Sequence, residues 1–207
     1  MYMSMNAYSF NMQSEGAGDT LISRDGVANI LQTAALIELI KANQITLAMI
    51  RPNVANSMKP ELIEGTAEAT LERNIYGLDV FLRFSFIFDL VAINEFYAGK
   101  SKEDQKQRPP ERDFHLASRW DEFVGIMTSG PTIGLLLSST TSDATESWRA
   151  QIGGWNIEQF PDPKTLRGKF GVHNYNNLLH GSDSSENVQR EIKIIAQCID
   201  RSRNSLG

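Results

Sequence analysis

Residues 177–184 read NLLHGSDS, and this stretch says more about the protein than any other. Two leucines precede His180, while Gly181 and Ser182 follow it, which is typical of a short buried strand that ends in a turn. A histidine at such a place is either a core residue with satisfied hydrogen bonds or a nucleophile whose ring nitrogens have different partners. The octapeptide alone fits both equally well. We expect Gly181 to remove bulk beside the imidazole, so that a phosphate-sized group could approach it in line.

The following residues, 184–197, have the amphipathic pattern of a helix. Glu191 lies nine positions after Ser182, so a helix that begins near Ser184 carries it about two turns back over the histidine. A carboxylate from this helix, together with Ser182, could hold one ring nitrogen of His180 and leave the other free as a nucleophile.

Upstream of this stretch, strand and helix patterns alternate. Alternating or continuous apolar residues predict three strands, at 45–49, 80–86 and 133–137. Helix-forming segments lie between them, and the glycines and prolines of residues 153–174 predict a long loop; the helices are expected at 60–73, 89–97, 115–127 and 144–152. From residue 45 the order is β-α-β-α-α-β-α-loop-β-α. This order predicts an α+β fold, a ferredoxin-like α/β sandwich with a four-stranded antiparallel sheet and helices.

The two ends and one internal segment have a different character. Residues 1–24 are polar and predict a disordered tail, and residues 28–41 predict an added N-terminal helix with Asp25 or Asn29 as its cap. Residues 99–113 contain nine charged residues and two adjacent prolines, which indicates a solvated surface insertion or, alternatively, a docking segment for a partner. We therefore expect an N-terminal extension (1–44), a domain (45–195) and a C-terminal tail (196–207).

Composition excludes several classes of protein. The chain has 207 residues and a net charge of −5, so we expect no nucleic-acid-coating surface. Its single cysteine, Cys198, excludes a disulfide framework and a cysteine zinc cluster. No apolar run approaches the roughly 18 residues that a membrane span needs. The N-terminus lacks the basic start of a secretory signal and the arginines of a mitochondrial presequence, so we expect a cytoplasmic protein, with a mitochondrial location as the alternative.

Two arginines are candidates for binding an anion: Arg149 follows Trp148 near the end of a predicted helix, and Arg167 lies in TLRGKF (165–170). Each alone is an ordinary surface residue, but guanidinium groups bind phosphate oxygens bidentately. Considered jointly, the motifs of residues 45–195 resemble those of the nucleoside diphosphate kinases. The resemblance is carried by NLLHGSDS (N-x-x-H-G-S-D-S), MTSGP at 127–131 (M-x-S-G-P), TLRGKF (T-[IL]-R-G-x-F), RAQIG at 149–153 (R-x-x-[IL]-G), IRPN at 50–53 (I-K-P-D) and FY at 96–97 (H-Y or F-Y). The chain looks closest to a divergent branch that includes a mitochondrial member.

The resemblance implies a ping-pong phosphoryl transfer, in which a histidine takes the γ-phosphoryl group of a nucleoside triphosphate and gives it to a nucleoside diphosphate. It implies Mg²⁺ bound through the nucleotide phosphates, broad base tolerance, and assembly as a homo-oligomer or as a subunit of a larger complex. The roles it implies are the following: His180 as nucleophile, Ser182 and Glu191 as its orienting groups, Tyr97 beside it, Arg51, Arg149 and Arg167 on the phosphates, and Asn177 on the ribose.

Several positions depart from the family pattern. Arg51 and Asn53 replace its lysine and aspartate, Trp155 replaces a phosphate-contacting threonine, and Arg119 and Asn174 stand where side chains cover the base. Trp120 could supply a stacking surface instead. These changes weaken nucleotide binding more clearly than they disable the nucleophile. An alternative hypothesis is therefore a catalytically reduced subunit that serves as a scaffold. A ferredoxin-like domain with no role in nucleotide chemistry fits the ordered motifs poorly.

Overall fold

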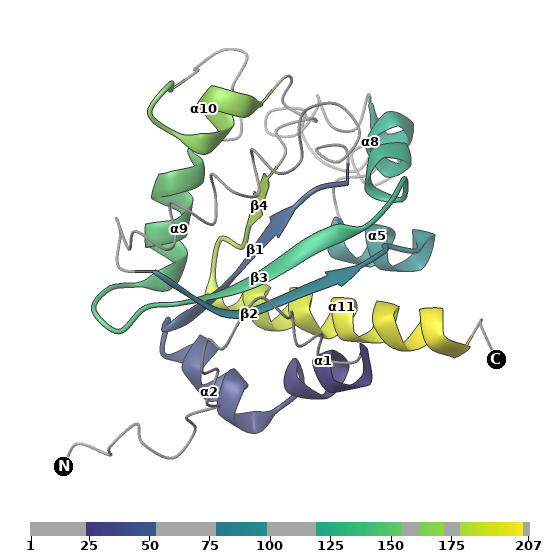
Figure 1. Cartoon of the computed structure of the whole chain (residues 1–207), viewed down its shortest axis with the longest axis horizontal. Coiled ribbons are helices and arrows are strands. Elements are labelled where there is room, and N and C mark those ends of the chain that lie inside the picture. Colours follow the sequence, from purple (N-terminus) through teal and green to yellow (C-terminus); the bar gives the residue numbers. More distant parts are fainter. Residues whose placement is uncertain (1–23, 53–77, 99–118, 155–161, 172–178, 205–207) are drawn as a thin grey trace, which may run out of the picture.

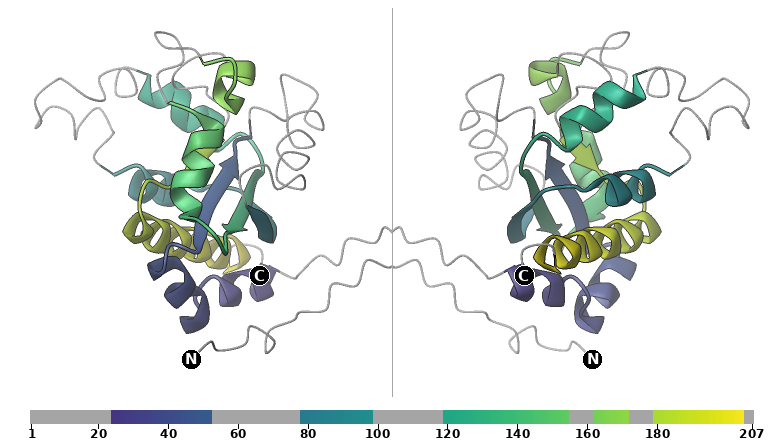
Figure 2. Two further views of the ribbon diagram at one scale, coloured as in Figure 1. Left: turned by 90° about the vertical axis from the view of Figure 1, so that its left-hand side faces the viewer. Right: turned by 90° about the vertical axis from the view of Figure 1, so that its right-hand side faces the viewer.

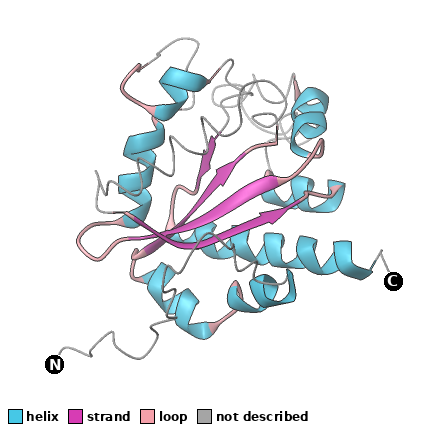
Figure 3. Ribbon diagram, in the orientation of Figure 1, coloured by secondary structure: helices cyan, strands magenta, loops and turns pink. Residues whose placement is uncertain are grey.

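The protein is described here by a computed structural model that covers residues 24–52, 78–98, 119–154, 162–171 and 179–204 (Figure 1). Four strands and seven helices follow one another in these ranges (Figure 3). Their order is α1 (Arg24–Ile30), α2 (Ala34–Lys41), β1 (Ile45–Ile50), β2 (Asp79–Phe86), α5 (Leu90–Phe96), α8 (Trp120–Met127), β3 (Thr132–Ser138), α9 (Ala144–Ile152), α10 (Leu166–Phe170), β4 (Leu179–Gly181) and α11 (Ser185–Asn204). The helix expected at 60–73 and the charged insertion at 99–113 lie outside the described residues.

The four strands form one antiparallel sheet in the order β2-β3-β1-β4. All six residues of β1 are buried, because β1 has a strand on each side and helices over both faces. Ile45, Leu47 and Met49 belong to one core cluster, whereas Ala48 and Ile50 belong to the other. The alternation that predicted this strand thus places it at the centre of the sheet. The predicted ferredoxin-like α+β sandwich is confirmed.

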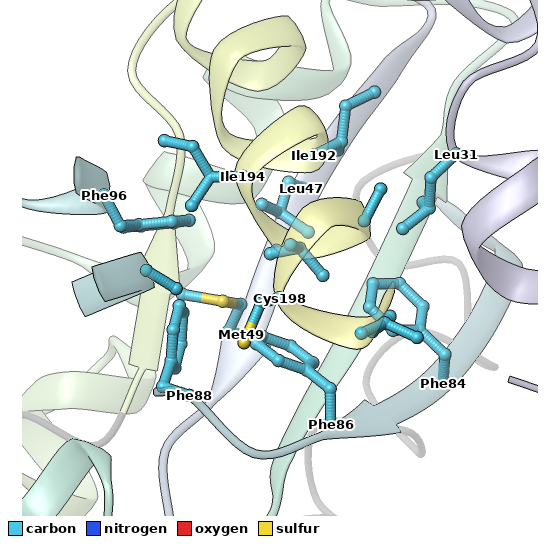
Figure 4. Packing of buried hydrophobic residues seen from close by; sticks show 14 of the residues in the cluster. Leu31, Leu47, Met49, Phe84, Phe86, Phe88, Phe96, Ile192, Ile194 and Cys198 are labelled. Carbon is cyan, nitrogen blue, oxygen red and sulfur yellow. The ribbon is translucent and has the colours of Figure 1, made fainter. Parts of the chain in front are cut away.

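Different helices cover the two faces of the sheet. On one face, α11 lies between the sheet and the helices α1 and α2 (Figure 2). Its apolar residues pack on Leu47 and Met49 of β1 and on an aromatic row that includes Phe86, Phe88 and Phe96 (Figure 4). On the opposite face, α9 packs across β1 and β4. Because β4 lies between α11 and α9, its three residues contact both layers in turn.

The prediction of one N-terminal helix over 28–41 is wrong in one respect, because the segment forms two helices with a break at Leu31–Thr33. Thr33 begins the second helix as its N-cap. Its backbone is extended, and its hydroxyl accepts a hydrogen bond from the Leu36 amide at 3.4 Å. The N-cap of α2 is therefore Thr33, not Asp25 or Asn29. Val27 of α1 and Leu36 of α2 are buried in the same cluster as residues of α11, so both helices belong to the core.

Two other expectations need correction. The segment 153–174 contains a short helix, α10, whose Thr165 hydroxyl accepts from the Gly168 amide at 3.2 Å. A side chain at Gly168 would collide with the backbone of Asp162, which explains a glycine inside a helix. The helix expected at 184–197 continues to Asn204, because Cys198 and Ile199 still pack in the core. Residues 196–204 are thus helix and not tail. No helix in the described residues is long and apolar enough to cross a membrane.

Candidate active site

His180 lies in the middle of β4, paired with Met49 of β1. Because side chains alternate along a strand, His180 points toward the α11 layer, while Leu179 and Gly181 point toward α9. The side chain of His180 is 13% exposed. The histidine is therefore held by the sheet but remains accessible to a ligand.

Two side chains after β4 hold the imidazole. The Nε2 atom of His180 lies 2.9 Å from Oε2 of Glu191, and the Ser182 hydroxyl donates to the same oxygen at 2.5 Å. An ionised carboxylate only accepts hydrogen bonds, so Nε2 carries the hydrogen and Nδ1 keeps its lone pair. The geometry thus fixes the tautomer in which Nδ1 is the nucleophilic nitrogen.

The start of α11 explains how Glu191 reaches the histidine. The Ser184 hydroxyl accepts from the Asn187 amide at 3.2 Å, and the exposed Asp183 accepts from the Asn187 side chain. These bonds begin the helix directly after β4. Glu191 then lies about one and a half turns into α11 and is buried on its inner side.

Two aromatic residues at the end of α5 form a wall beside the imidazole. The ring centroid of Phe96 lies 5.1 Å from that of His180, and the Tyr97 centroid lies 6.2 Å from it, both edge-on. Tyr97 is buried, and burial raises the pKa of its hydroxyl, with nearby Glu191 acting in the same direction and Arg51 and Arg167 opposing it. Tyr97 is therefore a neutral neighbour of the histidine at physiological pH.

Two of the three candidate arginines, Arg51 and Arg167, lie close enough to Tyr97 to affect its hydroxyl, and Arg149 acts on Arg167. Arg51 follows β1, is buried, and stacks over the Phe123 ring with its guanidinium carbon 5.3 Å from the ring centroid. Arg167 of α10 is also buried and donates to the carbonyl oxygens of Gly153 at 2.9 Å and Leu179 at 2.8 Å. Arg149 is exposed on the last turn of α9.

The charges of these arginines repel one another. Burial, helped by the positive charges of Arg51 and Arg149, lowers the pKa of Arg167 to about 9. Such a shift means that the charged guanidinium is destabilised in the folded protein. An anion bound beside Arg167 would offset this cost, so the site is electrostatically suited to phosphate groups.

Other candidate residues lie elsewhere or outside the described ranges. Arg119 is exposed and donates to both oxygens of Glu122, at 2.7 and 3.0 Å. Trp120 packs against Phe123 with 5.7 Å between the ring centroids. Four further residues that the sequence singled out lie outside the described residues, namely Asn53, Trp155, Asn174 and Asn177.

The expected role of Gly181 is wrong. The side-chain position of Gly181 faces away from the imidazole. A Cβ atom there would lie 2.7 Å from Cδ1 of Trp148 and 2.9 Å from Cδ1 of Ile152. The glycine therefore makes room for α9 and not for a phosphate. Trp148 also donates from Nε1 to the main-chain oxygen of His180 at 3.1 Å. The sequence showed this tryptophan only as the neighbour of Arg149, and it did not predict that the indole supports β4.

This packing predicts the effect of Gly181→Ala. The added methyl group must displace Trp148 or Ile152, so we expect the free energy of unfolding to fall by about 1–3 kcal/mol. Gly125→Ala on the exposed side of α8 is the matched control, because its Cβ meets nothing within 4 Å. That change should leave stability unchanged or raise it by up to about 1 kcal/mol. Urea denaturation measures both, and equal stabilities would contradict the packing described here.

Known proteins of one family match this chain. The family model described as nucleoside diphosphate kinase matches residues 44–198. Nucleoside diphosphate kinase 6 of Danio rerio is 32% identical over 155 residues, which are 74% of this chain and 76% of that protein. Among solved structures, the nucleoside diphosphate kinase of Aquifex aeolicus has a TM-score of 0.52 at 27% identity, covering 73% of this chain and 94% of the other. That of Encephalitozoon cuniculi has a TM-score of 0.55 at 25% identity, covering 73% and 87%.

Proposed function

Because the chain belongs to the nucleoside diphosphate kinase family, we propose that it transfers the γ-phosphoryl group of a nucleoside triphosphate to a nucleoside diphosphate through a phosphohistidine at His180. One observation carries the proposal. Glu191 holds Nε2 of His180 at 2.9 Å and is itself held by Ser182, which leaves Nδ1 as the nucleophilic atom. A core histidine that served only packing would not need a buried carboxylate dedicated to one of its nitrogens.

In the first half-reaction, Nδ1 of His180 forms a bond to the γ-phosphorus while the bond to the β–γ bridging oxygen breaks. The departing nucleoside diphosphate takes the electron pair of that bond. The hydrogen on Nε2 stays between the ring and Glu191, whose negative charge balances the positive charge that develops on the imidazole. In the second half-reaction, a terminal oxygen of another nucleoside diphosphate attacks the phosphohistidine and the Nδ1–phosphorus bond breaks. The histidine is then restored.

The three arginines are proposed to bind the phosphates. The positive charges of Arg51 and Arg149 both act on Arg167, and Arg51 also stacks on Phe123. An oligophosphate chain would neutralise the repulsion between these charges. Asn177 is proposed to bind the ribose, as the family motif implies. No three histidine, cysteine, aspartate or glutamate side chains gather into a metal site in the part of the chain that the structure describes. As the family resemblance implies, Mg²⁺ is proposed to bind through the nucleotide phosphates, where it would supply part of the charge neutralisation.

The alternative is a catalytically reduced subunit, and two features favour it. Where the family covers the base with an aromatic side chain, Arg119 instead pairs with Glu122 at 2.7 Å on the surface of α8. Arg167, in addition, already donates to two main-chain oxygens. Weaker nucleotide binding follows from both features, while the histidine and its carboxylate remain intact.

A pulse and chase experiment tests the proposed activity. The protein is mixed with ATP labelled in the γ-phosphate without an acceptor, and GDP, CDP or UDP is then added. We expect a protein-bound label that is lost in acid and kept in base, and that moves to each diphosphate on the chase. If no label binds to the protein, or if bound label does not move to any added diphosphate, the proposed kinase activity is refuted. Protection of the folded protein by nucleotide in a thermal shift, without label, would instead support the reduced subunit.

A further inference from the structure

Arg190 joins the helix of Glu191 to the helix of Phe96. On α11, Arg190 directly precedes Glu191, and its guanidinium donates to the carbonyl oxygen of Glu95 at 3.0 Å and to that of Phe96 at 3.2 Å from each of two nitrogens. Its Nε donates to the Asn187 side chain at 3.2 Å. These bonds give carbonyl groups at the end of α5 a further donor, since the Glu95 oxygen also accepts from the Ala98 amide at 3.4 Å.

The same guanidinium faces the catalytic carboxylate. Its Nη2 lies 3.5 Å from Oε1 of Glu191, while the other carboxylate oxygen, Oε2, takes His180 and Ser182. Glu191 is therefore shared, with the histidine and serine on one oxygen and a cation near the other. The guanidinium also lies 6.0 Å from the centroid of the Phe96 ring, whose edge contacts the imidazole.

We propose that Arg190 is a positioning residue that tunes the proton affinity of His180 through Glu191. This inference rests on the proposed function, because it concerns the histidine that would carry the phosphoryl group. A carboxylate beside an imidazole stabilises the charged imidazolium and raises its pKa. A cation on the same carboxylate opposes that effect. With Arg190 in place, the carboxylate of Glu191 therefore attracts the Nε2 hydrogen of His180 less strongly than it would alone.

The other charged or titratable groups near His180 come from different elements. They are Tyr97 of α5, Arg51 after β1, and Arg167 of α10, with Arg149 of α9 acting on Arg167. None of these groups is removed when Arg190 is changed. Arg190 differs from the other cations because it contacts the carboxylate that holds the imidazole. A change at Arg190 removes this contact together with its bonds to the α5 carbonyl groups, and Arg190→Lys, which keeps the charge, separates the two effects.

Arg201 provides a matched control on the same pair of helices. It also bridges α11 and α5, donating to both carboxylate oxygens of Asp89 at 2.8 and 3.1 Å. The side chains of Arg190 and Arg201 are similarly exposed, at 43% and 38%. Arg201 lies ten residues beyond Glu191, about 15 Å along the helix axis. Arg201→Gln therefore removes an arginine bridge between the same two helices but leaves the charges around His180 unchanged.

The experiment is a pH titration of the full-length protein followed by NMR of the histidine ring protons. The chain has three histidines, and the signal that disappears in His180→Gln identifies the one to follow. Arg190→Gln and Arg190→Met both remove the charge, so one serves if the other folds poorly. Arg190→Lys keeps the charge near Glu191 but offers fewer donors to the α5 carbonyl groups.

We expect the midpoint of His180 to rise by about half a pH unit in the two neutral variants, and to stay at the wild-type value in Arg190→Lys and Arg201→Gln. The acid limb of the transfer rate should move by the same amount. An unchanged midpoint in the neutral variants, or an equal rise in Arg201→Gln, would overturn the inference. The titration needs no catalysis, so failure of the proposed activity would appear separately, as absence of label on the wild-type protein.

Discussion

His180→Ala is expected to abolish phosphoryl transfer between nucleotides, with a loss of at least about 10⁴-fold in the transfer rate. The alanine leaves no nitrogen to form the phosphoenzyme, so the two half-reactions can no longer be separated in time. A coupled assay with ATP and a second nucleoside diphosphate measures the rate, and the pulse with labelled ATP measures the intermediate.

The fold should survive this substitution. His180 lies at the edge of the packed cluster and its side chain is partly exposed, so we expect a small change in thermal stability. His115→Gln, at a position with no proposed role, serves as the matched histidine control and should keep both the label and the rate. A His180→Ala protein that transfers phosphate at the wild-type rate would refute a phosphoenzyme at this residue.

Glu191→Gln is expected to lower the transfer rate by about 10²-fold. The amide has no negative charge to balance the imidazolium-like ring that forms during transfer, and it allows the ring to take either tautomer. Ser182→Ala removes only the bond that orients the carboxylate, so we expect a smaller loss of about tenfold. Single-turnover measurements of phosphoenzyme formation separate these effects from nucleotide binding.

A double substitution shows whether the serine acts through the carboxylate. In the Glu191→Gln protein, the further change Ser182→Ala should have almost no effect on the rate, because both residues act through the same oxygen, Oε2. Fully additive losses in the double variant would mean that Ser182 affects the reaction independently of Glu191.

Much of the fold could be predicted because its signals are local. The alternation of Ile45, Leu47 and Met49 predicted the central strand, and the spacing of Ser182 and Glu191 predicted that a helix carries the carboxylate over the histidine. The break at Thr33 was missed because helix-forming residues run continuously across it. The extension of α11 to Asn204 was missed because it depends on packing against elements far away in sequence.

The parts of the site that sequence could not predict depend on which face a residue occupies. A strand of three residues has too little pattern to show that Gly181 points toward Trp148 while His180 points toward α11. Arg190 meets Glu95 and Phe96 from about 95 positions away, and neither its neighbours nor its spacing indicates that contact. Local patterns thus located the nucleophile, and only the tertiary structure showed what surrounds it.

The most direct test of the account is the position of the phosphoryl group on the ring. The protein is phosphorylated with ATP and the phosphohistidine is examined by ¹H–³¹P NMR, which distinguishes substitution at Nδ1 from substitution at Nε2. Since Glu191 holds Nε2 at 2.9 Å, the account predicts phosphorylation of His180 at Nδ1. Phosphate on Nε2, or on another residue, would contradict it.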